Sequence, residues 1–162
     1  MSLTSFVRIH QRLTDDNGWG RRKRPVINID GDEAASYCQW LSEKSNQLYR
    51  LPTEEKWVYA CKAQTLTKYS FGNDEKKLNE YVWYIENSQG CTHPVGEKKP
   101  NKFGIFDMHG NVWEWCKDWH NNYQVNRGGA WYNDSSNLAI NISNKLYTND
   151  LTSGIGFSVV LA

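Results

Sequence analysis

Residues 100–115, PNKFGIFDMHGNVWEW, are the stretch of the chain that decides its fold. Turn-forming residues open the stretch at Pro100-Asn101 and interrupt it at residues 109–111, His-Gly-Asn. After the second turn, tryptophans are separated by even numbers of residues, a spacing that predicts a β-strand over residues 112–119. One face of this strand is then aromatic and the other more polar, with Trp113, Trp115 and Trp119 opposite Glu114, Cys116 and Asp118.

Two carboxylates flank the second turn. Asp107 precedes the turn and Glu114 lies in the strand that follows it, so their side chains and the intervening backbone carbonyls can converge. Oxygen ligands of this kind suit Ca²⁺. The same spacing also fits a turn capped by Asp107, with Glu114 paired to a basic side chain. Both interpretations stay open at the level of the residues.

Two helices are predicted in the first half of the chain. Asp30 as N-cap and Glu33 three residues later form a capping-box pattern, and apolar residues follow at helical spacing over about residues 31–46. The second helix starts after Thr53 as N-cap, with two acidic residues in its first turn, and ends near Ala63. Beyond residue 65 the turn-rich sequence predicts short strands between loops.

The composition restricts the class of protein. The chain has 162 residues and a formal net charge of +1, and 14% of its residues are aromatic, eight of them Trp, against 39% hydrophobic residues in all. Burial must therefore come mainly from large rings, which excludes disorder and argues against a leucine-rich bundle. The length predicts a single domain over residues 1–162. The balanced charge and the lack of a long apolar run predict no nucleic-acid partner and no membrane segment.

The cysteines and histidines show no spacing typical of metal ligands. The cysteines lie far apart without a CxxC pair, which excludes a zinc ribbon or a thioredoxin-like motif. Residues 1–8 lack the apolar stretch of a secretory signal. We therefore expect free, buried thiols in a reducing compartment and a cytoplasmic chain. A longer natural chain would instead allow association with a phage or a cell surface.

Two segments are candidates for contacts outside the fold. The basic run Arg21-Arg22-Lys23-Arg24 either grips phosphates beside Trp19 or forms a solvated loop, and the balanced charge favours the loop. Residues 132–154, YNDSSNLAINISNKLYTNDLTSG, are rich in Asn, Ser, Thr and Asp and lack Trp, Phe, Pro and Arg. This segment is either an exposed loop available for contacts or a solvated segment without a role.

Eight motifs occur along the chain in a fixed order: residues 24–29 RPVINI, 35–41 ASYCQWL, 49–60 YRLPTEEKWVYA, 69–72 YSFG, 93–96 HPVG, 100–115 PNKFGIFDMHGNVWEW, 126–131 NRGGAW and 155–157 IGF. Together they closely resemble the formylglycine-generating-enzyme (sulfatase-modifying factor) family. The resemblance implies an α+β fold, a variant of the C-type lectin fold with two helices, a small antiparallel sheet and much irregular loop. It also implies that the domain is shortened at its N-terminus or that the chain is a fragment, because the usual N-terminal strands are missing.

The resemblance argues against the reaction of the family's enzymes. Catalytic members use two cysteines shortly after an RGGS motif to bind copper, activate oxygen and convert a substrate cysteine to formylglycine. Here residues 127–130 read RGGA and no cysteine follows, so a soft ligand for Cu(I) is missing and we expect no copper. Cys38 and Cys61 sit where such enzymes form structural disulfides, but the partner positions fall near Ile140 and Val159. Both thiols should therefore be free.

The family's structural calcium matches this sequence better. By the motif, Asp107 and Glu114 supply side-chain oxygens, and Gly110 and Val112 supply main-chain carbonyls. The resemblance thus implies a bound Ca²⁺ with a structural role.

A second branch with the same fold binds ligands. The variable proteins of diversity-generating retroelements keep an RGG-[SA]-W motif and a closing IGF, with hypervariable ligand-contacting residues between them. Nearly every residue of 132–154 belongs to the set that mutagenesis of adenines in AAY codons yields, with Lys145 the exception. The arginines expected near Ala139, Ser143 and Ser158 are missing. The resemblance implies a non-catalytic protein that binds a protein or glycan ligand, and diversification by a retroelement is a hypothesis.

The contact residues that this branch implies are aromatic, amide, hydroxyl and aliphatic side chains similar to those of paratopes: Tyr123, Trp131, Tyr132, Asn133, Asp134, Ser136, Asn137, Ile140, Asn141, Ile142, Asn144 and Tyr147. The tryptophan-rich strand over residues 112–119 and the two helices should form their rigid base. Two alternatives stay open. One is an enzyme with other chemistry that uses Asp118, His120 or His109, and the other is a regulatory domain of the kind that family members fuse to kinases.

Overall fold

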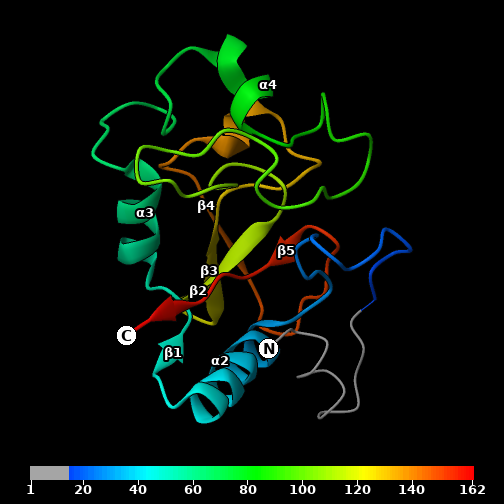
Figure 1. Cartoon of the computed structure of the whole chain (residues 1–162), viewed down its shortest axis with the longest axis vertical. Coiled ribbons are helices and arrows are strands. Elements are labelled where there is room, and N and C mark those ends of the chain that lie inside the picture. Colours follow the sequence, from blue (N-terminus) through cyan, green and yellow to red (C-terminus); the bar gives the residue numbers. More distant parts are fainter. Residues whose placement is uncertain (1–14) are drawn as a thin grey trace.

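A four-stranded sheet lies at the centre of the computed structural model, which describes residues 15–162 (Figure 1). In the order β4-β3-β2-β5, its strands are Ser143–Leu146, Tyr123–Arg127, Trp113–His120 and Ile155–Gly156. β2 pairs antiparallel with β3 and parallel with β5. The sheet is therefore mixed, whereas the resemblance implies an antiparallel one. A parallel neighbour needs a long crossover connection, and the segment between β2 and β5, which contains β3 and β4, provides it.

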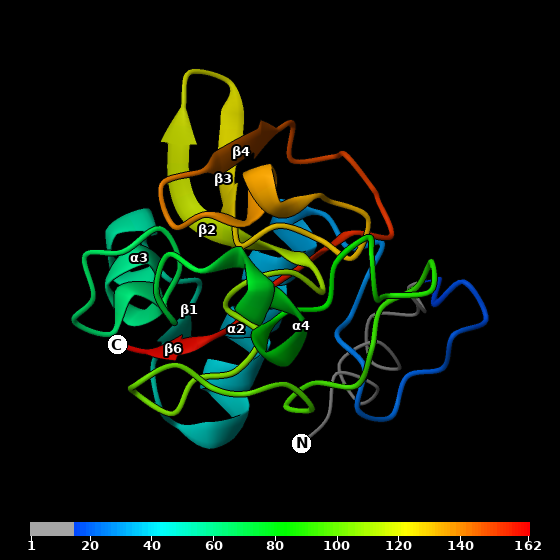
Figure 2. The same cartoon turned by 90° about the horizontal axis from the view of Figure 1, so that it is seen from above.

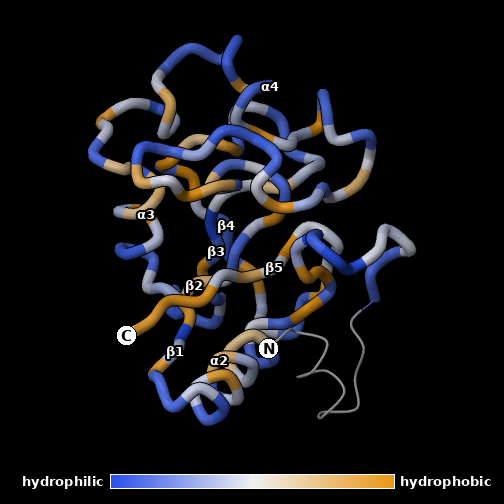
Figure 3. The backbone as a smooth tube through the Cα atoms, viewed as in Figure 1, coloured by the Kyte–Doolittle hydropathy of each residue, from blue (hydrophilic) through white to orange (hydrophobic). Residues whose placement is uncertain are grey.

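The predicted closing strand divides into two short strands. β5 pairs with β2, whereas β6, at Val160–Leu161, pairs antiparallel with β1, at Tyr49–Arg50. The residues between β5 and β6 join the two sheets. Figure 3 shows that this closing segment, which ends at the C-terminus, is apolar along most of its length. Ile155 at its start is buried in the core.

Both predicted helices are confirmed. α2 covers Gly31–Ser45 and begins with a capping box, in which Asp30 and Glu33 each accept a backbone N–H of the other residue. α3 covers Glu54–Lys62, and the Thr53 hydroxyl caps its first turn. The structure adds three helical turns too short to show a periodicity in the sequence: η1 at Glu75–Lys77, α4 at Leu78–Tyr81 and η2 at Ser135–Leu138. Within residues 15–162, no helix combines the length and the apolar character that crossing a bilayer requires.

One cluster of the core joins α4 and η2 and contains Tyr69, Leu78, Val82, Tyr84, Leu138 and Ala139, and the rest of the core lies on the two faces of the central sheet. On the α2 side it contains Ala34, Cys38, Leu51, Trp113, Trp115, Ala130 and Ile155. On the α3 side it contains Trp57, Cys61, Met108, Cys116, Val125 and Ile140. The neighbours Trp115 and Cys116 thus face opposite sides, as the alternation of a strand requires. Trp115 is fully buried, and its indole N–H donates to the carbonyl of Ile29 at 3.1 Å.

Trp119 does not belong to the aromatic face that the sequence predicts. The pairing of β2 with β3 shifts its register between Trp115 and Trp119, and the Trp119 side chain is 54% exposed. Figure 2 shows the end of the β2–β3 hairpin projecting from the body of the molecule. The rigid base of the fold is therefore the first half of β2, and its second half reaches into solvent.

All four cysteines are free thiols. Val159 packs against the cluster that contains Cys38, and Ile140 belongs to the cluster that contains Cys61. An aliphatic side chain thus lies beside each of the two cysteines for which the resemblance implies a disulfide in catalytic members. Apolar burial takes the place of a covalent link at both positions.

Candidate functional site

The turn after β3 begins the segment that the sequence assigns to ligand contact. Gly128 and Gly129 have φ angles of +107° and +83°, conformations that residues with a side chain rarely adopt. A Cβ atom on Gly129 would lie 2.5 Å from the Leu138 side chain. The two glycines therefore let the chain turn tightly against η2, and the segment starts from a fixed backbone geometry.

Arg127 holds the middle of this segment in place. Its guanidinium donates to the carboxylate of Glu54 from two nitrogens. It also donates to the carbonyls of Ile140, at 3.0 Å, and Ile142, at 2.8 Å. Only 11% of the Arg127 side chain is exposed. A planar, permanently charged group suits such forked bonding, so one side chain ties α3 to residues 140–142.

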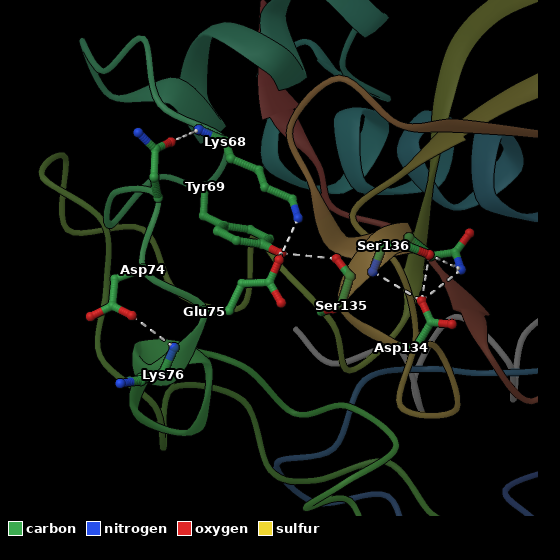
Figure 4. A network of polar contacts seen from close by, with 10 residues as sticks. Lys68, Tyr69, Asp74, Glu75, Lys76, Asp134, Ser135 and Ser136 are labelled. Atoms are coloured by element: carbon green, nitrogen blue, oxygen red, sulfur yellow. Dashed lines mark hydrogen bonds and ion pairs between the residues drawn. The ribbon is translucent and has the colours of Figure 1, made fainter.

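A polar network fixes η2, as Figure 4 shows. The Asp134 carboxylate accepts the backbone N–H of Ser136 at 2.9 Å and its hydroxyl at 2.5 Å. The buried Tyr69 donates its hydroxyl to the carbonyl of Ser135 at 3.0 Å. Beside it, Lys68 forms an ion pair with Glu75 at 2.6 Å. The turn that carries Asp134 and Ser136 is thus held by a loop from the first half of the chain.

Residues 138–140 turn into the core, which corrects the prediction for Ile140. Its side chain is only 5% exposed, because it packs with Trp57 and Cys61 on the α3 side of the sheet. Ile140 reaches the surface only as part of the wall of a cavity of about 600 Å³. The other residues that line this cavity are Val58, Lys62, Leu66, Thr67, Lys68, Arg127 and Asn141.

β4 and the turn after it form the second half of the segment. Ile142 is partly buried and packs against the core, so little of it is available for contact. Asn144 lies on β4 opposite Asn126 of β3. The ring of the exposed Tyr147 lies 4.5 Å from that of Tyr123, and their hydroxyls are 3.1 Å apart. Tyr123 therefore contacts Tyr147, whereas the sequence groups it with Trp131.

Trp131 and Tyr132 form a second aromatic group with Trp19. The Trp131 ring makes edge-to-face contacts with Trp19 at 5.5 Å and with Tyr132 at 5.1 Å. Its indole N–H donates to the carbonyl of Ser153 at 3.1 Å. A Cβ atom on Gly154 would lie 2.2 Å from the Tyr132 ring, so this ring packs directly on a glycine. Trp19 was not among the predicted contact residues. The sequence pointed to it only through its position beside the basic run.

The predicted contact residues differ in their availability. Exposed are Tyr123, Tyr132, Asp134, Ser136, Asn141 and Tyr147, and partly exposed are Trp131, Asn133, Asn137, Ile142 and Asn144. Asn133 accepts the backbone N–H of Ala130 at 2.8 Å, and Asn137 donates to Asp134. Such bonds stabilise the turn. The exposed tyrosines and Asn141 are therefore the side chains best placed for an external ligand.

A buried histidine lies beneath the segment, and the sequence does not reveal its role. The Nε2 atom of His109 accepts the backbone N–H of Ser70 at 3.0 Å, so Nδ1 donates to the carbonyl of Leu138 at 2.7 Å. Burial lowers the pKa of His109 to about 4 and raises that of the Cys61 thiol, whose sulfur lies 3.6 Å from Nε2. Both groups are thus neutral at pH 7 and closed to solvent, and they link three segments of the chain.

The three residues of the enzyme hypothesis lie in separate settings. His109 belongs to the buried network. Asp118 accepts the backbone N–H of Glu54 at 2.6 Å, where it caps the start of α3. His120 is exposed at the end of β2. The structure does not bring these three side chains together in one site.

Asp107 and Glu114 are desolvated carboxyl groups. Glu114 accepts the indole N–H of Trp57 at 2.8 Å, instead of pairing with a basic side chain. Asp107 accepts the backbone N–H of Gly96 at 2.7 Å. Burial raises the pKa of Glu114 to about 7 and also raises the pKa of Asp107. Between residues 15 and 162, no group of three or more His, Cys, Asp or Glu side chains is arranged for a metal ion. The predicted site would rely on these two carboxylates and on the carbonyls of the turn.

Comparisons with known proteins agree with this architecture. Residues 7–162 match the sulfatase-modifying factor enzyme 1-like domain. The chain is 35% identical over 161 residues to the chaperone protein LppX of Paenibacillus barcinonensis, and the aligned region covers 82% of this chain and 56% of that protein. It is 35% identical over 106 residues to the formylglycine-generating enzyme of Mycobacterium tuberculosis, and this aligned region covers 59% of the chain and 33% of the enzyme. The chain therefore spans only part of the length of these relatives.

A solved structure supports the fold directly. Variable protein 1 of Treponema denticola superimposes with a TM-score of 0.84 at 28% identity, over 93% of this chain and 75% of that one. The fold is the formylglycine-generating-enzyme-like variant of the C-type lectin fold, with mixed α and β structure. Because the family match extends over residues 7–162, the chain belongs to the sulfatase-modifying factor enzyme 1-like family.

Proposed function

We propose that the chain is a non-catalytic ligand-binding protein, and that the exposed side chains of residues 131–154 form its contact surface, called the ligand surface below. The observation that carries this proposal is the way the segment is held. Its backbone is fixed from within by Arg127 and by Tyr69, and its buried part lies in the core, while the Asn141 and Tyr147 side chains face solvent. A fixed backbone with exposed aromatic and amide groups lowers the entropic cost of binding.

Two further points support a binding role for a protein or glycan ligand. The chain shares its fold with a protein named variable protein 1. No cysteine follows Trp131, so residues 132–162 offer no thiolate to hold copper as in the formylglycine-generating enzymes. The Cys61 thiol, which lies 3.6 Å from the Nε2 atom of His109, is buried.

The ligand surface can be tested with a double variant, Tyr132→Ala/Asn141→Ala. Ligands are first selected with the wild-type chain from a glycan array and from a displayed peptide library. We expect the affinity of a selected ligand, measured by biolayer interferometry, to fall at least tenfold in the double variant, because two exposed contacts are removed. An unchanged affinity would place the binding site elsewhere.

A matched control uses the exposed face of the two helices. Tyr59 on α3 and Gln39 on α2 are also an exposed tyrosine and an exposed amide. The variant Tyr59→Ala/Gln39→Ala should retain wild-type affinity. Equal losses in both double variants would show a general effect on folding and would count against the proposed surface.

The same surface suits diversification by a retroelement. Its exposed positions lie on turns and at the end of a strand, and two residues that fix its backbone, Arg127 and Tyr69, lie outside residues 132–154. Side chains on the ligand surface can then vary without loss of the scaffold. A template repeat for residues 132–154 beside a reverse-transcriptase gene in the genome would support this hypothesis, and the lack of both would overturn it.

We also propose a structural Ca²⁺ at the turn between Asp107 and Glu114. The two carboxyls are desolvated, a neighbouring carboxylate raises the pKa of each further (Asp107 acts on Glu114, and Glu97 on Asp107), and neither forms an ion pair within the described chain. A cation held by these side chains and by the carbonyls of Gly110 and Val112 would supply the missing countercharge with the hard oxygen ligands that Ca²⁺ prefers. Its role would be to stabilise the turn that leads into β2.

Calcium should therefore raise the melting temperature of the wild-type chain. An ion present at about 100 times its dissociation constant stabilises the folded state by about 2.7 kcal/mol, or roughly 5–10 °C for a domain of this size. Differential scanning calorimetry with calcium and with a chelator measures this shift. Glu114→Gln keeps the shape of the side chain and should abolish the response. A wild-type melting temperature that is the same in calcium and in chelator would contradict the proposal.

A further inference from the structure

The basic run near the N-terminus lies next to the ligand surface. Trp19, which precedes the run, packs edge-to-face against Trp131. After the run, the backbone N–H of Asn28 donates to the carbonyl of Thr152 at 3.1 Å. Figures 1 and 2 both show this first part of the described chain beside the segment that leads into β5. The fold thus brings together two segments that are far apart in the sequence.

Contacts with other segments hold the backbone of the run, and two of its charged side chains form no ion pair in the described chain. Arg21 forms an ion pair with Asp16 at 3.2 Å, and the Arg24 guanidinium lies 3.9 Å from the sulfur of Cys91. The carbonyl of Lys23 accepts the backbone N–H of Val95 at 2.8 Å, which anchors the middle of the run. The side chains of Arg22 and Lys23 are exposed and form no ion pair with any residue of 15–162.

The two carboxylates of the ligand surface accept hydrogen bonds from the chain itself. Asp134 accepts the bonds that cap η2, and Asp150 accepts the backbone N–H of Tyr147 at 3.0 Å. On the other side of the surface, the cavity next to Asn141 is lined by Lys62, Lys68 and Arg127 and by no acidic residue. Of these three cations, Lys68 and Arg127 are paired, and Lys62 is exposed without an ion pair in the described chain. Unpaired positive charge therefore borders the surface on two sides.

We propose that the ligand surface binds an acidic glycan, one that carries carboxylate or sulfate groups. This inference rests on the proposed function and specifies its ligand. The amide and hydroxyl groups of the surface suit the hydroxyls of sugars, and the rings of Tyr132 and Tyr147 offer apolar faces. Arg22, Lys23 and Lys62 supply the charges for the acidic groups, and arginine in particular matches carboxylate and sulfate with two donors.

Other polyanions and a protein partner fit the surface less well. Nucleic acids draw most of their affinity from many phosphate contacts, whereas the cations that border the surface without an ion pair in the described chain are Arg22, Lys23 and Lys62. Hot spots of protein interfaces are enriched in Trp, Tyr and Arg, so the exposed Tyr132 and Tyr147 suit a protein as well as a glycan. The many exposed or partly exposed Asn, Asp and Ser side chains of residues 132–154, together with the unpaired cations at its borders, favour the acidic glycan.

The test compares charged glycans with their neutral parents. The full chain is applied to an array that carries uronate, sialylated and sulfated glycans and the corresponding uncharged glycans, with polyglutamate and a single-stranded oligonucleotide as further probes. We expect binding to acidic glycans, with a clear preference over the neutral parents. The uronate and sulfated arms then show which acidic group is recognised.

The double variant Arg22→Gln/Lys23→Gln should weaken this binding at least tenfold and reduce its dependence on salt concentration. The control Lys76→Gln/Lys77→Gln changes the net charge equally at two exposed, adjacent lysines of η1 and should bind as the wild type does. Equal binding by both variants, a preference for neutral glycans, no glycan binding, or equally tight binding of polyglutamate or the oligonucleotide would overturn the inference. A ligand that is lost with Tyr132→Ala/Asn141→Ala but unaffected by Arg22→Gln/Lys23→Gln would overturn it and leave the proposed function in place.

Discussion

Gly110→Ala is expected to reduce the free energy of unfolding by about 2–5 kcal/mol, the sum of the strain of a left-handed L-residue and of overpacking. Gly110 has a φ of +76° and lies in the turn between Asp107 and Glu114. A Cβ atom there would lie 2.1 Å from the carbonyl oxygen of Trp83 and 2.6 Å from a methyl group of Val82. The closer of the two contacts is with the backbone, which cannot move aside as a side chain can.

The neighbours of Gly110 fix the turn from both sides. Its own N–H donates to the carbonyl of Gly128 at 2.9 Å, and the N–H of Asn111 donates to the carbonyl of Trp83 at 2.8 Å. A shift of the turn to relieve the clash would therefore disturb hydrogen bonds to two other segments. Because Gly128 lies in the turn that leads into residues 131–154, the damage should extend to the ligand surface.

Gly104→Ala is the matched control. Gly104 has a φ of +77°, but no atom lies within 4 Å of the position of its Cβ. The variant therefore carries the strain alone, about 1–2 kcal/mol. Urea denaturation followed by tryptophan fluorescence measures both variants. Equal losses of stability at the two glycines would contradict the role of the contact with Trp83.

Arg127→Met is expected to cost about 3 kcal/mol, the lower end of the range for breaking a buried ion pair. The lower end applies because 32% of the Glu54 side chain is exposed, although only 11% of Arg127 is. The variant keeps much of the apolar volume of the side chain but leaves the carboxylate of Glu54 and the carbonyls of Ile140 and Ile142 without their donor. Hydrogen exchange should accelerate in residues 140–146, because their link to α3 is lost.

An exposed ion pair provides the comparison for this variant. Lys99 and Glu80 are 2.6 Å apart, with 61% and 47% of their side chains exposed. Lys99→Met removes one charge in the same way as Arg127→Met, but water replaces the lost partner, so the stability should remain within experimental error of the wild type. If the two variants lost the same stability, the interior position of Arg127 would not be the cause.

Local features of the sequence were sufficient for the helices and for the start of the central strand. The capping box at Asp30 and the N-cap at Thr53 lie within one turn of the helices they start, so their effect depends on near neighbours alone. The alternation of Trp113, Glu114 and Trp115 likewise shows a strand with two different faces. Each of these predictions agrees with the structure.

Where the predictions failed, the missing information was the position of a distant segment. Trp119 continues the aromatic period, but the hairpin carries it away from the core. Ile140 belongs to a segment that is rich in Asn, Ser, Thr and Asp as a whole, yet it is buried because α3 presents Trp57 and Cys61 to it. Exposure depends on what covers a residue, and the spacing of a pattern does not contain that information.

The sequence by itself determined the family, the two helices, the first half of the central strand and the absence of cysteine from residues 131–162, because each depends on residue identity and short-range spacing. Only the tertiary structure decided which residues of 131–154 face solvent, and that Trp19 and the basic run lie beside Trp131. The first depends on contacts of α3 and Tyr69 with residues 135–142, and the second on contacts between segments more than 100 residues apart. Such contacts form only when the whole core packs, since no local rule fixes which loops the sheet brings together.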